Sequence, residues 1–383
     1  VVETVALGAA TGRLLAADVT ASAPLPRFAA AAMDGWALAP ARPTPAAGPA
    51  DAPLRWLLGD AIAAGDSPAT TTLQPGTARP ISTGAVVPAG AVAVLRAEQG
   101  DVTRDSAGRL WLSPRHPVRD GDHIRPAGEE AAAGDVLLRA PITLTPPRIA
   151  LAAAAGRDSL TVRRLPSMDV LILGDELVRS GVPGGGAIRD LLGPTIPGIG
   201  ANLGLRDGEV REVTDSLAAT VAALQHCSSD VVVTTGGSSH GAADHMRRAL
   251  ATLGARMVFD GVRMRPGHPV MLAELPDGRP VLSLPGNPLA AFICLASFGV
   301  PLADAMLGRP ARPLDVERMA GAVPPGTGST RLVACQRDPS GLSPVTWQGS
   351  SMVRGLADAD VVAVVPVQGV AAGARVQTLP LPW

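Results

Sequence analysis

The sequence contains no lysine, and this absence excludes several classes of enzyme. All 33 basic residues of the 383-residue chain are arginine. Without lysine no Schiff base can form, so pyridoxal phosphate enzymes and lysine-type aldolases are excluded. A Walker A motif also needs lysine, so the chain is not a standard P-loop NTPase. Arginine can still bind oxyanions, because its planar guanidinium matches their geometry bidentately.

Tyrosine is also absent, cysteine is scarce, and the net charge is only −1. Cys227, Cys294 and Cys335 match no metal-binding spacing, so they are expected to be small buried hydrophobic residues. Such sparse cysteine fits a reducing cytoplasm. The low net charge provides no field that attracts nucleic acid or an anionic membrane. No apolar run reaches the length of a membrane span and no signal peptide is apparent, so we expect a cytoplasmic protein.

The most informative stretch is residues 230–246, which read DVVVTTGGSSHGAADHM. An apolar run at residues 231–233 predicts a buried strand, and a helix is expected from Asp244 onward. The intervening loop is rich in glycine, which lets backbone approach a ligand. Free N–H groups at the helix start favour a phosphate-like anion. A hydrolytic triad or a zinc site on this loop is less favoured, because one loop holds all the side chains and no third zinc ligand is suitably spaced.

The pattern of apolar runs predicts several domains of different class. Residues 54–122 carry short apolar runs between turns, which is typical of an all-β module. Residues 145–156 predict a helix that begins near two prolines. From residue 169 onward, strands alternate with helices, including a helix over 215–226 with Asp215 as its N-cap and a long apolar helix over 289–307. The residues after 308 predict a small all-β domain.

Polar residues in 169–308 cluster at predicted strand ends and helix starts. In an open α/β sheet, carboxylates beyond the carboxyl ends of strands sit where ligands bind. Oxygen ligands together with phosphate favour Mg²⁺. We therefore expect an Mg²⁺-assisted site for a phosphorylated or oxyanionic ligand, built from Asp175, Glu176, Asp190, Asp207, Asp244, Arg189, Arg206 and Arg265. The turn at residues 285–288, which opens the long helix, is a second place to hold an anion.

These motifs, taken in order, resemble the molybdopterin molybdenumtransferase family, which is MoeA-like and includes the gephyrin E domain. AMDGWAL (32–38), ISTGAVVPAG (81–90) and RPAGEE (125–130) resemble family segments of the first half. ILGDELV (172–178), TTGGSSHGAADHM (234–246), RPGHP (265–269) and LPGNPLAAF (284–292) resemble segments of the central domain. QGSSMVRGLADADVVAVVP (348–366) resembles the C-terminal segment. The resemblance covers nearly the whole chain. It marks the chain as similar to a divergent, actinobacterial-like member of the family.

The resemblance implies an α/β plus β fold in an elongated, homodimeric chain. A split linker domain would comprise residues 1–38 and 123–166, with a small β module inserted at 39–122. A central three-layer α/β domain of molybdopterin-binding type would span 167–308, and a β-barrel-like domain 309–383. The implied reaction uses adenylylated molybdopterin and molybdate as substrates and Mg²⁺ as cofactor. Molybdenum enters the dithiolene, the phosphoanhydride is cleaved and AMP leaves; the upstream adenylyltransferase is a possible partner.

The resemblance also implies site residues. Catalytic roles would fall to Asp34, Thr83, Glu176, Asp207 and Asp244, of which Glu176 and Asp244 would bind the metal. The substrate-binding residues would be Gly236, Gly237, Ser239, Gly241, Asp190, Arg265, His268, Pro285, Gly286, Asn287, Pro288 and Ser350.

The sequence departs from the family pattern at several positions. Arg265 and His268 replace the two lysines of the family's KPGKP turn, and Leu191 and Leu192 replace its Ser/Thr-Asn pair. Glu130 stands where the family has Asp, and Leu173 where it has Thr. These departures leave open a non-catalytic pterin-binding or scaffold paralogue. A molybdopterin adenylyltransferase is the other alternative, although such a stand-alone enzyme would be much shorter.

Overall fold

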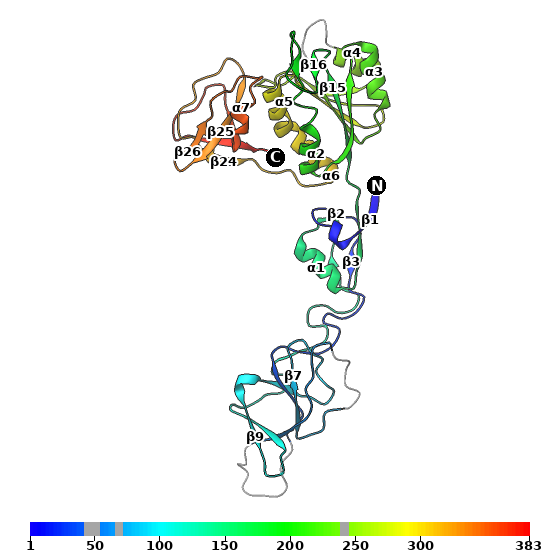
Figure 1. Ribbon diagram of the computed structural model, residues 1–383, viewed down its shortest axis with the longest axis vertical. Helices are drawn as coiled ribbons and strands as arrows, with labels where there is room; N and C mark the ends of the chain where they lie inside the picture. The colour runs from blue at the N-terminus through cyan, green and yellow to red at the C-terminus, as the bar shows by residue number, and fades with distance from the viewer. Residues whose placement is uncertain (42–53, 66–71, 238–244) are drawn as a thin grey trace. The chain divides into compact units, whose positions relative to one another are not determined.

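The computed structural model describes residues 1–41, 54–65, 72–237 and 245–383, and the chain separates into two compact units (Figure 1). The first unit comprises residues 1–162 and the second residues 163–383. Each unit has its own sheets and its own hydrophobic cores.

The two ends of the first unit combine in one four-stranded sheet of order β1-β14-β2-β13. Helix α1, Pro146–Ala154, shares a core with this sheet, in which Leu15, Leu144 and Val162 are buried. The helix begins after its N-cap Thr145 with two prolines in the first turn, where a missing N–H costs nothing, as the sequence predicts. The strands are β1 (Val2–Ala6), β2 (Leu14–Leu15), β13 (Ile142–Thr143) and β14 (Ser159–Arg163).

A six-stranded sheet of order β8-β5-β7-β6-β10-β9 forms the rest of the first unit's regular structure, with two short ladders, β3–β12 and β4–β11. Strand β5, Gly35–Leu38, pairs with both β7 and β8, so the domain boundary predicted after residue 38 is corrected. Leu38 is buried against Trp56 and Leu112, which makes this strand part of the inserted module. The other elements are β3 (Val19–Thr20), β4 (Ala30–Ala31), β6 (Trp56–Leu58), β7 (Thr77–Ile81), β8 (Ala93–Arg96), β9 (Gly100–Arg104), β10 (Leu110–Pro114), β11 (Ile124–Arg125), β12 (Val136–Leu138) and the 3₁₀ turns η1 (Leu7–Ala9) and η2 (Ala97–Gln99).

The second unit is built on a six-stranded sheet of order β18-β15-β19-β23-β22-β20. The first four strands in that order are parallel. At the other edge β22 pairs antiparallel with β23, and β20 pairs antiparallel with β22. Strands β15 and β19 are buried along almost their whole length, as expected for parallel strands covered on both faces. The strands are β15 (Ser167–Leu173), β18 (Arg206–Val213), β19 (Val231–Thr235), β20 (Arg256–Asp260), β22 (Met271–Glu274) and β23 (Pro280–Leu284).

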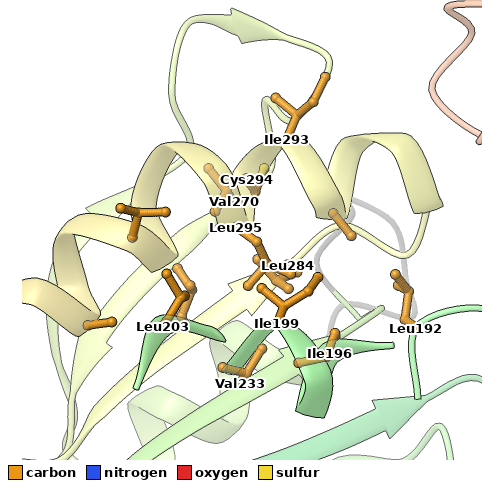
Figure 2. Close-up of a cluster of buried hydrophobic side chains, with 14 of the residues drawn as sticks. Leu192, Ile196, Ile199, Leu203, Val233, Val270, Leu284, Ile293, Cys294 and Leu295 are labelled. Atoms are coloured by element: carbon orange, nitrogen blue, oxygen red, sulfur yellow. The ribbon is translucent and has the colours of Figure 1, made fainter. Parts of the chain in front are cut away.

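Helices cover both faces of this sheet, which gives three layers and confirms the predicted α/β class. On one face, α2, α5 and α6 pack in one cluster, and Figure 2 shows Ile199 of α2 and Leu295 close to Leu284 of the sheet. On the other face, α3 and α4 contribute Leu224 and other buried side chains. The helices are α2 (Ile196–Leu203), α3 (Leu217–His226), α4 (His245–Thr252), α5 (Pro288–Cys294) and α6 (Val300–Leu307).

The predicted long apolar helix is a continuous helical segment, residues 288–307, made of α5, the π-helical turn η3 (Leu295–Gly299) and α6. Pro301 lies in the first turn of α6. Proline lacks an N–H and clashes with the carbonyl four residues earlier, which is relieved by widening the preceding turn. The segment is long and apolar enough to cross a membrane, with mean hydropathy 1.8, so the prediction that no apolar run reaches this length is wrong. Its residues instead form part of the core, 61% buried.

The C-terminal residues, joined by the short strand at residues 264–265, form a small closed β-sheet. Its strand order is β21-β25-β27-β28-β24, with β26 paired to β25. Ala320, just after β24, donates its N–H to the carbonyl of Leu342 on β26 (2.9 Å), so the sheet closes on itself around a core that includes Met319, Val333 and Val361. The elements are β21 (Met264–Arg265), β24 (Asp315–Arg318), β25 (Thr330–Asp338), β26 (Gly341–Pro344), β27 (Val361–Val365), β28 (Arg375–Pro380) and α7 (Arg354–Ala357).

The three cysteines are buried and unpaired, as predicted. Burial raises the pKa of Cys227 to about 12 and that of Cys335 to about 11, and it also raises the pKa of Cys294. Because the thiolate is the nucleophile and the metal ligand, these side chains have no such chemistry at neutral pH.

Two buried hydroxyls in the centre of the sheet make no hydrogen bond to any described residue. Thr234 on β19 and Ser283 on β23 are register neighbours, and both are fully buried. An unsatisfied buried hydroxyl costs free energy that an apolar side chain of the same shape avoids. Thr234→Val is therefore expected to raise the free energy of unfolding by about 1 kcal/mol, measured by urea denaturation.

A matched control is available on helix α3. The hydroxyl of Thr220 is also buried but donates to the carbonyl of Ser216 (2.8 Å). Thr220→Val should lower the free energy of unfolding by about 1 kcal/mol. Equal effects of the two substitutions would contradict the interpretation of Thr234.

Candidate functional site

The carboxyl ends of the four parallel strands open into one cavity of about 450 Å³. Strand β15 is followed there by Glu176, β18 by Asp215, β19 by Gly236 and Gly237, and β23 by the turn at residues 285–288. Ligands of open α/β sheets bind outside the carboxyl ends of the strands, at the point where the strand order reverses. The structure therefore brings together most of the central-domain residues that the sequence predicts, namely Glu176, Asp190, Gly236, Gly237, Pro285, Gly286, Asn287 and Pro288.

Glycine is required at position 236 beside this cavity. Gly236 has φ +81°, and a Cβ there would lie 2.5 Å from the carbonyl oxygen of Leu173. Only glycine allows this left-handed backbone together with so close a contact. A Cβ on Gly286 would lie 3.5 Å from the Cα of Gly236, an ordinary van der Waals contact, so the two loops lie close together with their backbones accessible to a ligand.

Three carboxylates, those of Glu176, Asp190 and Asp215, line the cavity, and a fourth, that of Asp175, lies beside Asp215. The backbone N–H of Asp215 donates to Oδ1 of Asp175 (3.2 Å). Burial, followed by the negative charges of Asp175 and Glu176, raises the pKa of Asp215. A carboxylate whose pKa is raised in a cleft is a candidate general base or acid.

The structure corrects the role predicted for Asp215. The N-cap of α3 is Ser216, whose Oγ accepts the N–H of Ala219 (3.2 Å). Asp215 precedes the cap and is free to line the cavity. Ser and Asp are nearly equal as N-caps, so local preference could not decide between these adjacent residues.

Asp207 does not lie at this site. It is the second residue of β18, is exposed, and pairs with Met168 at the beginning of β15. Because β18 runs to Val213 before reaching the cavity edge, Asp207 lies about 20 Å from that edge at roughly 3.3 Å per residue. The predicted catalytic position of Asp207 is therefore corrected, and Asp215, at the other end of the same strand, takes its place in the cavity.

Asp190 lines the cavity, but its carboxylate is already used by the backbone. Its Oδ1 accepts the N–H groups of Leu192 (3.0 Å) and Gly193 (2.9 Å). The aspartate thereby holds the turn after β17 (Ile188–Arg189). Leu192, one of the departures from the family pattern, is 4% exposed and belongs to the hydrophobic core, which explains an apolar residue at that position.

A second cavity of about 560 Å³ adjoins the first and shares Pro269, Pro285 and Asn287 with it. The predicted residues Arg265, His268 and Ser350 line it. Nδ1 of His268 lies 2.8 Å from the carbonyl oxygen of Val262. Since a carbonyl can only accept, this nitrogen carries the proton and anchors the ring to the backbone.

Two arginines lie side by side in the second cavity. Arg265 on β21 pairs in register with Arg331 on β25, and both line the cavity. Neither forms an ion pair with a carboxylate among the described residues. The hydroxyl of Ser329 beside them is buried and has no hydrogen-bond partner in the described chain. Adjacent like charges with no counter-charge favour a bound anion.

In the first unit, Asp34 and Thr83 come together although 49 residues separate them. Oδ1 of Asp34 accepts the backbone N–H of Thr83 (2.7 Å) and its hydroxyl (3.0 Å). These hydrogen bonds, the backbone one first, lower the pKa of Asp34. Both side chains are exposed and Asp34 is ionised at neutral pH, so the pair can receive a ligand or a neighbouring chain.

Three predicted site residues, Ser239, Gly241 and Asp244, lie outside the described residues. In the described part of the chain, no group of three His, Cys, Asp or Glu side chains could by itself hold a metal ion. The described side chains alone would therefore not complete the coordination of a metal at the first cavity.

Several cavity residues were missed by the sequence reasoning. Asp215 carried a usable signal, because it is the first carboxylate after the end of β18, a strand that the sequence analysis did not predict. Arg189 was predicted as part of the site, and it does line the first cavity. Arg331 and Ser329 had no local signal, because only the pairing of β25 with β21 places them beside Arg265.

Comparison with known proteins identifies the family. A model of the MoeA N-terminal region (domain I and II) matches residues 1–156, and a model of a probable molybdopterin binding domain matches residues 169–305. The chain is 32% identical over 308 residues to a molybdopterin molybdenumtransferase of Staphylococcus aureus, covering 80% of this chain and 71% of that one. It is 34% identical over 317 residues to molybdopterin molybdenumtransferase 2 of Mycobacterium tuberculosis, covering 80% and 76%.

Solved structures agree with these relatives. A molybdopterin biosynthesis MoeA protein from Pyrococcus horikoshii has a TM-score of 0.80 and 25% identity, covering 100% of this chain and 94% of that one. A second structure of the Pyrococcus horikoshii protein, at 23% identity and TM-score 0.76, supports the fold alone. On the identity and coverage of its relatives, the chain belongs to the molybdopterin molybdenumtransferase (MoeA) family.

Proposed function

We propose that this protein is a transferase of molybdenum cofactor biosynthesis that inserts molybdenum into adenylylated molybdopterin, with Mg²⁺-dependent cleavage of the phosphoanhydride and release of AMP. One observation carries the proposal. A cavity with carboxylates and glycine loops, suited to a phosphoanhydride, adjoins a second cavity with paired arginines, suited to an oxyanion. Insertion of an oxyanion into a phosphoanhydride-bearing pterin needs both kinds of site side by side.

In the first cavity, the chain's own residues can bind and hydrolyse the phosphoanhydride. The loops at Gly236 and Gly286 leave backbone accessible to phosphate oxygens. Asp215 has a raised pKa and is placed to take the proton of a water that attacks phosphorus. The phosphorus–oxygen bond of the anhydride then breaks, and AMP and the pterin phosphate are the products. The oxygen of the water stays on the phosphate whose phosphorus was attacked.

Among the described residues Glu176 would hold Mg²⁺, because Asp215 is assigned as the base. Mg²⁺ in phosphate sites is commonly bound by one or two carboxylates, substrate phosphates and several waters, so few carboxylates suffice. Bound there, it would neutralise negative charge on the phosphoanhydride. The predicted contribution of Asp244 remains part of this proposal.

The second cavity would bind molybdate. Arg265 and Arg331 supply two guanidinium groups, and Ser329 and Ser350 supply hydroxyls. The cavities meet at Pro269, Pro285 and Asn287, so an oxyanion in the second can reach the dithiolene of a pterin in the first. His268 also lines the second cavity, and its ring is hydrogen-bonded to the carbonyl oxygen of Val262.

We further propose that the protein is a cytoplasmic homodimer and that Asp34 and Thr83 of one protomer complete the cavity of its partner. Their hydrogen-bonded, ionised arrangement supports a role beyond that of an ordinary turn. The upstream adenylyltransferase would deliver the adenylylated substrate.

A non-catalytic pterin-binding paralogue is the second candidate. His268 in place of lysine and Leu192 in place of asparagine favour it, because the first change replaces an ammonium group and the second removes a polar side chain. The carboxylates at Glu176 and Asp215 argue against it, because a scaffold has no need of a carboxylate with a raised pKa. An adenylyltransferase is disfavoured by the C-terminal sheet that supplies Arg331.

The test is release of AMP from adenylylated molybdopterin in the presence of Mg²⁺, followed as molybdate is varied. Arg331→Gln is expected to raise the molybdate concentration needed for half-maximal release by roughly ten- to hundredfold, the loss of one charged hydrogen bond. Arg337→Gln is the control, because Arg337 lies on the same strand but pairs with Glu317. Binding of the nucleotide without molybdate-dependent release would contradict the transferase and leave the non-catalytic paralogue.

A further inference from the structure

Arg189 is held rigidly at the wall of the first cavity. It lies on β17, which pairs in parallel with β16 (Leu177–Val178). The N–H of Ile188 donates to the carbonyl of Glu176 (2.8 Å), and the N–H of Asp190 donates to the carbonyl of Val178 (3.0 Å). The backbone is therefore held by hydrogen bonds on both sides of Arg189, which fixes the position of its Cα.

One nitrogen of this guanidinium is buried and unsatisfied. Nη1 of Arg189 has no hydrogen-bond partner among the described residues. The side chain also forms no ion pair there, although Glu176 and Asp215 line the same cavity. A buried N–H of a charged group that makes no hydrogen bond costs more than a neutral one. A bound ligand with an acceptor oxygen would satisfy this N–H and remove that cost.

The missing acceptor is best supplied by a phosphate. Arg189 is the only Lys, Arg or His among the described residues that line this cavity. The glycine loops of the same cavity can donate backbone N–H groups but no positive charge. A guanidinium can bind a phosphate through two parallel hydrogen bonds, and no described carboxylate of the cavity forms an ion pair with Arg189 here.

We propose that Arg189 is the phosphate-recognition residue of the site, which binds the adenylyl phosphate through Nη1 and aligns it with Asp215. The inference rests on the proposed function for the identity of the nucleotide, and it deepens that function by naming the group that selects for the phosphate. Selection for phosphate by one cation also explains how a chain without lysine recognises an anion inside a cavity walled by carboxylates.

The experiment compares the binding of AMP and adenosine by isothermal titration calorimetry, with Mg²⁺ and without molybdate. The wild-type chain should bind AMP more tightly than adenosine. Arg189→Gln should weaken AMP binding by roughly ten- to hundredfold and leave adenosine binding unchanged. Arg189→Lys, which keeps the charge but not the fork, should fall between them. A wild-type chain that binds both probes equally, or an unchanged preference in Arg189→Gln, would overturn the inference.

Thermal unfolding of the apo proteins separates recognition from a structural role. Because Nη1 makes no hydrogen bond, Arg189→Gln should unfold at the same temperature as wild type or higher. A clear fall would show that the side chain supports the fold and would overturn the inference. Arg179→Gln is the charge-matched control: Arg179 directly follows β16, the strand paired with β17, but it forms an ion pair with Glu212, and its loss should not change the preference for AMP.

The outcomes also separate this inference from the proposed function. If AMP preference depends on Arg189 but no molybdate-dependent release occurs, the transferase proposal fails and the recognition role stands. If release occurs and Arg189→Gln keeps the preference for AMP, the recognition role fails alone.

Discussion

Asp215→Asn is expected to reduce molybdate-dependent AMP release by roughly 10²–10⁴-fold, the contribution of a positioned general base. Asparagine keeps the shape of the side chain but cannot accept a proton. The fold should not suffer. Burial and the charges of Asp175 and Glu176 raise the pKa of Asp215, so its ionised form opposes folding above that raised pKa, and the penalty is relieved as the pH falls through it. At pH 7 the variant should therefore be as stable as wild type or more stable.

The control for this variant lies on the same strand. Asp207→Asn removes an exposed carboxylate at the opposite end of β18, and it should leave both AMP release and stability within error of wild type. The measurements are initial rates of AMP release and urea denaturation at pH 7. A rate loss in Asp207→Asn with normal activity in Asp215→Asn would restore the original assignment and contradict the one made here from the cavity.

Mixing variants tests the proposed homodimer within the same assay. Asp34→Asn and Asp215→Asn proteins should each be inactive alone. After subunit exchange about half of the dimers should be mixed, each with one intact site, so about a quarter of the wild-type activity should return. No recovery, with exchange verified, would mean that Asp34 does not serve the partner's cavity.

Asp169→Asn is expected to lower the free energy of unfolding by about 2–4 kcal/mol. Asp169 on β15 is 5% exposed. Its carboxylate accepts the N–H of Glu209 (2.8 Å), the hydroxyl of Ser229 (2.7 Å) and the N–H groups of Ser228 and Ser229 (both 3.2 Å). The amide group of asparagine would turn a donor toward these donors and leave some of them buried without a partner. Urea denaturation at pH 7 measures the loss.

The effect should depend on pH in a defined direction. Burial by itself raises the pKa of Asp169, but the hydrogen bonds from Ser229, Glu209 and Ser228 outweigh it and hold the pKa below its usual value. The stabilisation is thus fully present above the unfolded-state pKa, about 3.9, and is lost as the pH falls through the lowered folded-state value. The difference between wild type and Asp169→Asn should shrink in acid, and a difference that grows in acid would contradict this account.

Much of the fold follows from the sequence, because its signals are local. The valines at 231–233 predict a buried strand, and Pro146 and Pro147 predict where α1 begins. The glycine loop at 236–237 and the turn at 285–288 were both predicted as ligand-binding elements, and both line the first cavity. Each prediction depends on a residue type whose backbone preference differs strongly from the others.

The errors arose where two local interpretations were nearly equal in energy. Asp215 and Ser216 are both good N-caps, and only the end of β18 decides that Ser216 caps α3. Asp207 lies near the start of β18 and Asp215 just after its end, and the direction of the strand in a parallel sheet decides which one reaches the cavity. The helix at 288–307 is apolar enough for a membrane, and only its packing on the sheet makes it a core element.

The sequence by itself determined the class of each segment, the glycine loops and the family to which the chain belongs. The tertiary structure alone decided which charges meet. Arg265 and Arg331 become neighbours through the pairing of β21 with β25, and Arg189 is left with an unsatisfied nitrogen although carboxylates line the same cavity. The physical reason is that backbone preference acts within a few residues, whereas the pairing and burial of charges depend on contacts between residues far apart in the chain.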